Sequence, residues 1–393
     1  MKKGGAMKKL ICFMITAIMV ITMLAGIVSA EEPALDRSWP EETIKIGVEV
    51  YDTSDDTVVG YETYFNYLAE YYNLEFIFSE SIASAEDELA FIENCGSAGC
   101  KGFISGYNVS RDTSIKRATE LGMYYWGVDR DLDAEFADNE YYLGGFLPVV
   151  DGSDAEGNGD YLLGYELAYT LVAGGSQHIA FCNGGADLGV PFFIDRQEGF
   201  FAGIEQAKAD GYEFVFDPET DVVSGFPGTD EFAARQSQII NGDYDAIGVS
   251  FSGALVWLQP IIDAGKMGQV KLAGVGVVDE TVADLSESGT IGAMVYECEE
   301  IIFGNAVAMI INAVNGHADL VKGEEGFLAI PTNRWTVVEA DDFKAIAQKH
   351  AAGEYYITAE DLVQFFPEFN PDTTRDEFIE FYRSKTLANT VTK

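Results

Sequence analysis

Charged residues follow two apolar runs of the sequence, and their side chains suit hydrogen bonding to a polar ligand. Asp129 and Arg130 come directly after residues 123–128, and Arg196 follows residues 178–182 and a glycine-rich turn. A carboxylate accepts hydrogen bonds from hydroxyls, while a guanidinium donates several in one plane, so this combination suits a polyol. The alternative for Asp129 and Arg130 is a surface ion pair. For Arg196 it is a structural cation that bridges two lobes of the protein or neutralises nearby acids.

Four more candidate residues stand just after other apolar runs. Tyr51 ends the first run, Phe251 and Ser252 follow residues 246–249, and Glu297 follows a later run. An aromatic ring such as Tyr51 can pack on the apolar C–H face of a sugar, and ordinary core or rim packing is the alternative. If these runs are parallel strands, their carboxyl ends meet at one edge, where ligands of open α/β sheets bind.

Short apolar runs alternate with amphipathic helical patterns along most of the chain. The expected strands are residues 43–51, 74–78, 101–107, 123–128, 141–146, 178–182, 213–216, 246–249, 270–275, 291–296 and 335–338. The expected helices are residues 57–72, 84–95 (with Ser84 as its cap), 112–121, 161–172, 230–241, 254–264, 282–288 and 299–315, and one beginning near Asp195. This alternation predicts an α/β fold with a mostly parallel, doubly wound sheet.

The run Arg196-Gln197-Glu198-Gly199-Phe200 resembles the R-x-x-G-F signature of the type 1 periplasmic binding proteins, which are sugar binders like ribose-binding protein and the lac repressor. In this reading Gly199 lets its helix approach the sheet, and Phe200 fills the core beneath. The resemblance covers about residues 43–339. It implies two doubly wound, Rossmann-like lobes joined by a three-segment hinge.

The same resemblance implies the domain boundaries. The amino-terminal lobe is expected at residues 41–151 plus 297–329, and the carboxy-terminal lobe at 152–296 plus 330–341. Residues 342–393 form an extra helical tail that departs from the family pattern, and packing against a lobe is its expected role. The implied ligand contacts are Asp129, Arg130 and Tyr51 from one lobe, and Arg196, Phe251, Ser252 and Glu297 from the other lobe or the hinge.

Three binding positions differ from the family pattern. Ser250-Phe251-Ser252 stands where relatives show Asn-Asp, Gly276 replaces a binding aspartate, and Glu297 stands where a glutamine often contacts sugar. A sugar bound in the usual way would lose hydrogen-bond partners. The expected ligand is therefore a sugar or related polar solute, with a partly apolar solute as the alternative. Four aromatic residues would suit the latter: Phe192, Phe193, Phe251 and Trp257.

The composition bounds the partners and the location of the protein. Asp and Glu number 65 against 24 Lys and Arg, which gives a formal charge of −41 and argues against nucleic acid and anionic membrane surfaces as partners. Lysines followed by the apolar residues 10–28 and by Val28-Ser29-Ala30 predict a cleaved Sec-type signal peptide over residues 1–30, and an uncleaved anchor is the alternative. No cysteine stands directly after the apolar run, so a lipid anchor is not expected. The predicted location is periplasmic or secreted.

No residue pattern for catalysis, a cofactor or a metal stands out. Asp154-x-Glu156-x-Asn158-Gly159 resembles a calcium loop but has Tyr165 where a bidentate Glu is needed. The histidines are scattered, including His350, and each is interpreted as structural. Cys95 and Cys100 flank a short glycine-containing loop, and both a disulfide and two reduced thiols remain open.

The function that follows from the resemblance is capture of a small ligand in an interlobe cleft and delivery to the permease of an ABC importer, by a monomer that is not an enzyme. A sensory binding protein for a chemoreceptor or sensor kinase is one alternative. An enzyme that reuses the fold is the other.

Overall fold

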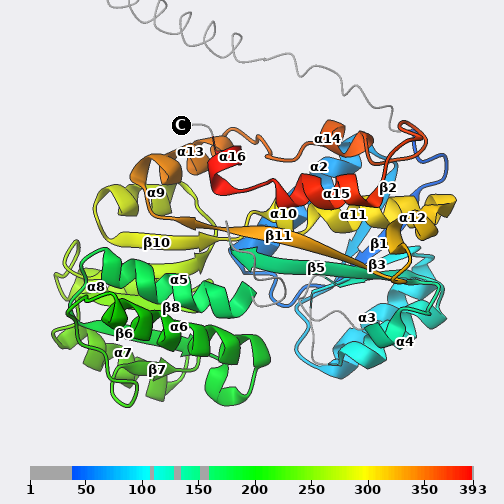
Figure 1. Cartoon of the computed structure of the whole chain (residues 1–393). Helices are drawn as coiled ribbons and strands as arrows, with labels where there is room; N and C mark the ends of the chain where they lie inside the picture. The colour runs from blue at the N-terminus through cyan, green and yellow to red at the C-terminus, as the bar shows by residue number, and fades with distance from the viewer. Residues whose placement is uncertain (1–37, 107–109, 128–133, 151–158, 392–393) are drawn as a thin grey trace, which may run out of the picture. The chain divides into compact units, whose positions relative to one another are not determined.

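The computed structural model describes residues 38–106, 110–127, 134–150 and 159–391. Within these residues, eleven strands form one sheet in the order β2-β1-β3-β4-β5-β11-β10-β9-β8-β6-β7 (Figure 1). The strands are β1 (Ile44–Val48), β2 (Leu74–Phe78), β3 (Gly102–Ser105), β4 (Tyr124–Gly127), β5 (Tyr142–Val150), β6 (Ile179–Gly184), β7 (Val222–Ser224), β8 (Ala246–Val249), β9 (Lys271–Gly276), β10 (Ile291–Tyr296) and β11 (Leu328–Val337). All neighbouring pairs are parallel except β10 with β11. The predicted α/β class with a mostly parallel sheet is confirmed.

One long strand joins the two halves of this sheet. Residues 328–334 of β11 pair with β5, and residues 335–337 pair with β10. We call β1 to β5 the first half and β6 to β10 the second half. Strands β5 and β11 lie side by side through the middle of Figure 1. The lobe boundaries drawn from the sequence remain a prediction.

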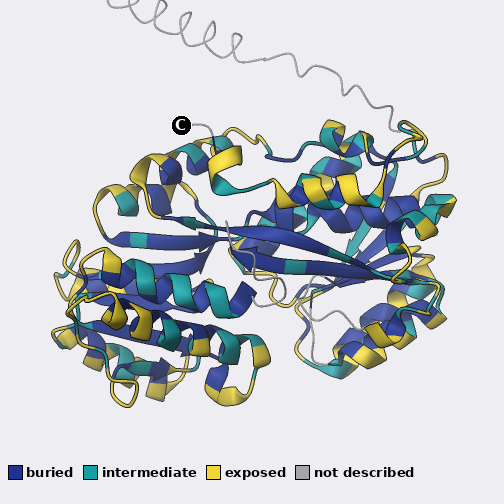
Figure 2. Ribbon diagram, viewed as in Figure 1, coloured by how far each residue is buried: buried dark blue, intermediate teal, exposed yellow. Residues whose placement is uncertain are grey.

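Helices flank the strands, which are mostly buried apart from the edge strands β2 and β7, while the outward helix faces are exposed (Figure 2). The helices are α2 (Asp56–Tyr71), α3 (Ala85–Ala98), α4 (Arg111–Glu120), α5 (Gly159–Ala173), α6 (Pro191–Ala209), α7 (Asp230–Asn241), α8 (Leu258–Asp263), α9 (Glu280–Glu287), α10 (Glu299–Ile302), α11 (Gly304–Asn312), α12 (Ala318–Lys322), α13 (Ala340–Ala351), α14 (Ala359–Val363), α15 (Arg375–Arg383) and α16 (Leu387–Thr390).

Polar residues and a proline fix where several of the helices begin. The side chain of Asp55 accepts a hydrogen bond from the Thr57 amide at the start of α2, and Ser84 caps α3 as the sequence predicted. Helix α6 begins at Pro191 and not near Asp195, because proline at the first helical position needs no hydrogen-bond donor. Arg196 therefore lies in the second turn of α6, not in the first.

Helices α5 and α6 pack unusually close together. A Cβ atom on Gly199 would lie 1.8 Å from the Tyr161 carbonyl oxygen, and one on Gly164 would lie 1.8 Å from the Arg196 carbonyl oxygen. The expectation that Gly199 lets α6 approach the sheet is corrected, since the close approach is to α5. The expectation for Phe200 holds, because its ring is fully buried and stacks on Phe181 with centroids 3.9 Å apart.

One expected strand is misplaced. Residues 213–216 make only an isolated bridge between Val215 and His178, and the strand β7 follows later. The carboxylate of Asp221 accepts a hydrogen bond from the Asp217 amide, which closes a turn between these two segments. The strand expected at residues 335–338 begins seven residues earlier, at Leu328, as β11.

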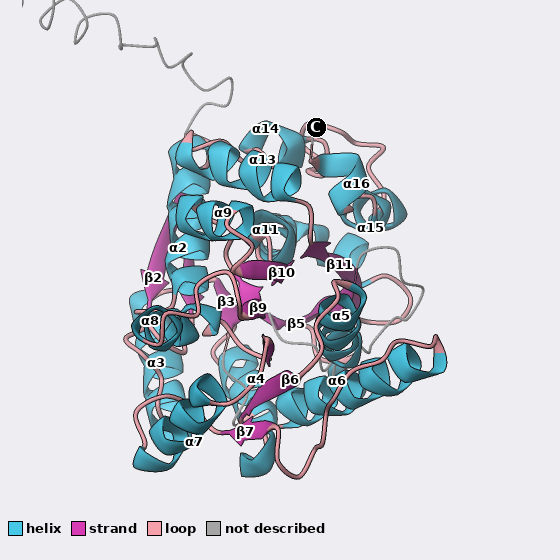
Figure 3. Ribbon diagram, turned by 90° about the vertical axis from the view of Figure 1, so that its left-hand side faces the viewer, coloured by secondary structure: helices cyan, strands magenta, loops and turns pink. Residues whose placement is uncertain are grey.

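The tail helices α13 to α16 pack on the body of the protein, on the side that carries α2 and α11 (Figures 1 and 3). The hydroxyl of Tyr64 in α2 donates to the Ile357 carbonyl at 2.9 Å, and the Asn312 amide in α11 donates to the Phe365 carbonyl at 2.9 Å. By length and composition, the stretch Glu299–Lys322 could span a membrane, but 67% of its apolar window is buried inside the protein, as in a core helix.

Candidate ligand-binding site

A cavity of about 1020 Å³ opens at the carboxyl ends of strands from both halves of the sheet. Five of the residues predicted from the sequence line it: Tyr51, Arg196, Phe251, Ser252 and Glu297. They come from the loops after β1, β8 and β10 and from α6. The position agrees with the rule that open α/β sheets bind ligands beyond the carboxyl ends of their strands. Asp129 and Arg130 lie outside the described residues.

Arg196 is 5% exposed and is held by several contacts. Its Nε donates to Oδ1 of Asp160 at 2.7 Å, and one terminal nitrogen donates to the Ser250 carbonyl at 2.6 Å. Its guanidinium carbon lies 5.0 Å from the ring centroid of Phe192 and 5.5 Å from that of Phe193. Arg196 thus reaches the cavity, and it also has the neutralising role that the sequence left as the alternative.

A second buried arginine in the cavity wall was missed by the sequence analysis. Arg334 of β11 is 1% exposed, and one of its terminal nitrogens donates to the same Asp160 oxygen at 3.2 Å. Its Nε lies 2.7 Å from Oε1 of Glu297, an ion pair whose angle is not that of a hydrogen bond. The signal was weak, because Arg334 follows the polar residues Thr332 and Asn333 and stands just before the strand expected at residues 335–338.

The loops after β1 and β8 meet at the cavity. The Ser252 hydroxyl donates to Oδ2 of Asp55 at 2.7 Å, while Oδ1 of Asp55 caps α2. Tyr51 stands beside them with 38% of its surface exposed. Desolvation, followed by the Asp55 and Glu297 carboxylates, raises the pKa of Tyr51, so its hydroxyl stays protonated and can donate a hydrogen bond.

Four phenylalanines of the second half form one wall of the cavity, which we call the phenylalanine wall. They are Phe192 and Phe193 at the start of α6, Phe226 after β7, and Phe251 after β8. The rings of Phe226 and Phe251 lie 5.2 Å apart, and those of Phe193 and Phe226 lie 5.5 Å apart. Trp257, expected to join such a wall, is fully buried against Phe232 instead.

Other charged side chains also reach the cavity. Glu49, Asp52, Asp55, Arg111 and Asp195 line it, and none of them was singled out in the sequence. Glu49 is 1% exposed and accepts a hydrogen bond from the Ser105 hydroxyl at 2.9 Å. Glu49 follows β1 directly, so its place at a strand end was the available signal. The cavity therefore combines aromatic surface with carboxylates and arginines.

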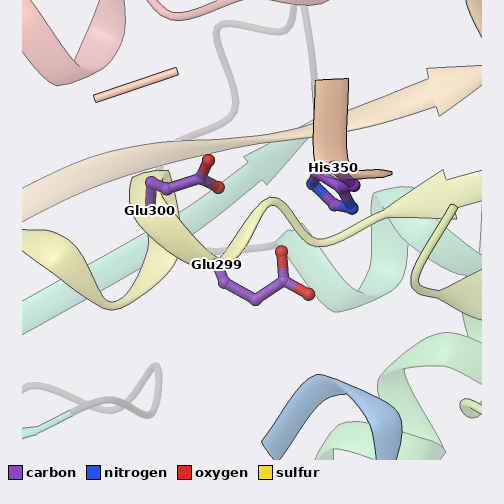
Figure 4. A group of neighbouring side chains, drawn as sticks. All are labelled: Glu299, Glu300 and His350. Atoms are coloured by element: carbon purple, nitrogen blue, oxygen red, sulfur yellow. The ribbon is translucent and has the colours of Figure 1, made fainter. Parts of the chain in front are cut away.

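Within the described residues, one group of side chains comes close enough together to hold a metal ion (Figure 4). The ligand atoms of Glu299, Glu300 and His350 all lie within 4.8 Å of one another. The Tyr296 hydroxyl bonds His350 Nε2 at 2.6 Å and Glu299 at 3.3 Å, and the Cys298 thiol donates to Glu300 at 2.8 Å. These contacts form a hydrogen-bond network that connects β10 and α10 to the tail helix α13.

No family model and no curated protein sequence matches the chain. Solved structures do match. An ABC transporter solute-binding protein from Bacillus halodurans with bound myo-inositol superposes with a TM-score of 0.56 at 17% identity, covering 78% of this chain and 98% of that one.

Two further structures agree with the first. A galactofuranose-binding protein gives a TM-score of 0.58 at 14% identity, with 79% and 99% of the two chains covered. The periplasmic binding protein of an arabinose ABC transporter from Shewanella sp. ANA-3 gives 0.57 at 17% identity, with 78% and 97% covered. The chain has their two-lobed fold. The expected periplasmic-binding-protein fold is thereby confirmed, and the three structures leave about a fifth of this chain uncovered.

Proposed function

We propose that this protein captures a small solute, a sugar or a related polar molecule, in the cavity at the strand ends and delivers it to the permease of an ABC importer outside the cytoplasm. The observation that carries the proposal is the cavity itself, which lies between side chains from both halves of a solute-binding-protein fold. It acts as a monomer and catalyses no reaction. Residues 1–30 are its cleaved signal peptide.

The residues proposed to contact the solute are Tyr51, Asp129, Arg130, Arg196, Phe251, Ser252 and Glu297. Tyr51 and Glu297 offer a donor and an acceptor for hydroxyl groups beside the cavity. A ligand that touches both halves binds best when they meet, so it shifts the population toward a closed state. The lobe boundaries at residues 151/152, 296/297 and 329/330 are proposed as the points where the chain crosses.

Calorimetric titration with a panel of sugars and cyclitols tests this function. At least one compound is expected to bind, and Tyr51→Ala is expected to weaken its binding about tenfold, because the ring and its hydroxyl are lost from the cavity. Tyr212→Ala is the matched control, since Tyr212 is 41% exposed and does not line the cavity. No binding of any solute, or equal losses in both variants, contradicts the proposal.

A further inference from the structure

The phenylalanine wall presents apolar surface that the protein itself does not cover. Phe226 is 38% exposed, and Phe192 and Phe251 are partly exposed, although all of them line a cavity. Two aromatic residues from the first half, Tyr61 and Phe146, are better covered at 3% exposed each, whereas Tyr51 is 38% exposed. Exposed aromatic rings inside a cavity mark a place where a ligand buries its own apolar surface.

Contacts within the protein hold the phenylalanine wall in place. Phe193 is 6% exposed and contacts Phe192, Phe226 and Phe251 with ring centroids 4.2, 5.5 and 6.4 Å away. The guanidinium of Arg196 lies over Phe192 and Phe193, and Asp160 fixes it from behind. Rings that are already ordered lose little conformational entropy on binding, which favours affinity.

The cavity also has more room than one sugar ring needs. Its volume of about 1020 Å³ lies at the upper end of the range of about 300–1,000 Å³ that is typical of sites for drug-sized ligands. The polar residues Tyr51, Asp55 and Glu297 come from the loops after β1 and β10, whereas the phenylalanine wall comes from α6 and the loops after β7 and β8. A ligand with one hydroxylated part and one flat apolar part matches both sets.

We propose that the phenylalanine wall is a subsite for an aromatic ring, and that the ligand is an aromatic ring joined to a sugar, as in a nucleoside or an aryl glycoside. This inference rests on the proposed function and narrows its solute class. The ring packs against Phe226 and Phe251, whose planes are inclined by 67°, so it stacks on one of them and meets the other edge-on. The sugar hydroxyls donate to Asp55 and Glu297 and accept from Tyr51.

Calorimetry with the purified protein tests the subsite, using adenosine and D-ribose as one pair and phenyl β-D-glucopyranoside and D-glucose as the other. One aromatic compound is expected to bind at least tenfold more tightly than its sugar alone, and the pair that does so distinguishes a nucleoside from an aryl glycoside. Phe226→Ala and Phe251→Ala are each expected to weaken the binding of that compound about tenfold, which is the contribution of one stacking contact. Phe226→Ala should leave binding of the free sugar within threefold, because Phe226 is not among the residues proposed to contact the sugar.

Phe369→Ala is the control, because Phe369 is 46% exposed and does not line the cavity. Phe226 is exposed enough that its replacement should keep the fold, which thermal unfolding checks. Free sugars that bind as tightly as their aromatic derivatives, or wall variants that behave like Phe369→Ala, overturn the subsite and leave the proposed function standing. Failure of all four compounds and of the wider sugar panel overturns both.

Discussion

Arg196 and Arg334 both donate hydrogen bonds to Asp160. The position of one of these arginines could be predicted from a local motif, and the position of the other could not. Arg196 belongs to the R-x-x-G-F run, so its place in the cavity was predictable from five consecutive residues. Arg334 lies 174 residues from Asp160 in the chain, and only the fold brings them together. A residue whose partner is so distant carries no local sequence pattern that points to that partner.

Replacing Arg334 with Met should strongly destabilise the protein. The change removes the ion pair of Arg334 with Glu297 and its contact with Asp160, and breaking a buried ion pair costs about 3 kcal/mol or more. Urea unfolding measures the loss. Arg117→Met is the control, because Arg117 pairs with Glu93 and Glu120 on the surface, where a loss within about 1 kcal/mol is expected. If Arg334→Met loses no more free energy of unfolding than Arg117→Met, the buried arginine is not needed for stability.

Glu88 gives the stability of the protein a dependence on pH. It is fully buried in the first turn of α3, and desolvation raises its pKa although the Ser114 hydroxyl bonds to it. The folded state therefore binds more protons than the unfolded state as the pH rises above the ordinary glutamate value of 4.5. It follows that the contribution of Glu88 to the free energy of unfolding is lost as the pH rises above this ordinary value toward neutrality.

The variant Glu88→Gln, which stays neutral, should then be more stable than the parent at pH 7 and lose this advantage near pH 4. Chemical unfolding at a series of pH values measures the difference. Glu93→Gln on the same helix is the control with the opposite sign, because Arg117 lowers the pKa of Glu93. A gain at pH 7 that persists unchanged at pH 4 would show that the amide acts through packing and not through charge.

At the scale of elements, the alternation of apolar runs and helical patterns predicted most of the sheet. This pattern placed an element wrongly where a single proline or a short turn decides where the element begins. Pro191 moves the start of α6, and the turn at Asp217 to Asp221 displaces β7. Gly276, where the resemblance implied a lost aspartate, has φ of 129°, a backbone conformation that side chains disfavour. The absence of a carboxylate there is therefore built into the backbone.

The contact between α5 and α6 should not tolerate a single added methyl group. Gly199→Ala would place Cβ against the Tyr161 carbonyl of α5, so the two helices must separate at a cost of about 3 kcal/mol. Denaturant unfolding measures it, and the movement of α6 should also weaken ligand binding through Arg196. Gly292→Ala in β10 is the control, because its nearest neighbours would lie at 3.7 Å. A neutral Gly199→Ala would mean that the helices are not in close contact.

At the scale of the whole molecule, the sequence indicated a helical tail but not its place. The tail bonds back to β11, where the Asn333 amide donates to the Arg383 carbonyl at 2.8 Å and the Trp335 indole donates to the Lys385 carbonyl at 2.9 Å. Each partner is 50 residues away in the chain, so no periodicity could predict the pairing. The tail therefore covers the strand that links the two halves of the sheet.

The hydrogen bond between Ser252 and Asp55 is a direct link between the halves beside the cavity. Such a bond contributes about 1 kcal/mol, so its loss in Ser252→Ala should shift the balance from closed toward open about fivefold. The apparent affinity for a ligand falls by the same factor when the closed state is the minor one, because only that state binds fully. Calorimetry measures the affinity, and small-angle scattering of the ligand-free protein measures the opening.

The loop after β1 supplies a control for this link. The Ser54 hydroxyl bonds Asp52 at 2.7 Å within the same loop and does not cross between the halves, so Ser54→Ala should leave both measurements unchanged. Asp55→Asn keeps an acceptor for Ser252 and a cap for α2, so it should reduce the ligand affinity less than Ser252→Ala does. If Ser252→Ala changes neither the affinity nor the scattering radius, this bond does not contribute to closure, and the ligand alone must hold the halves together.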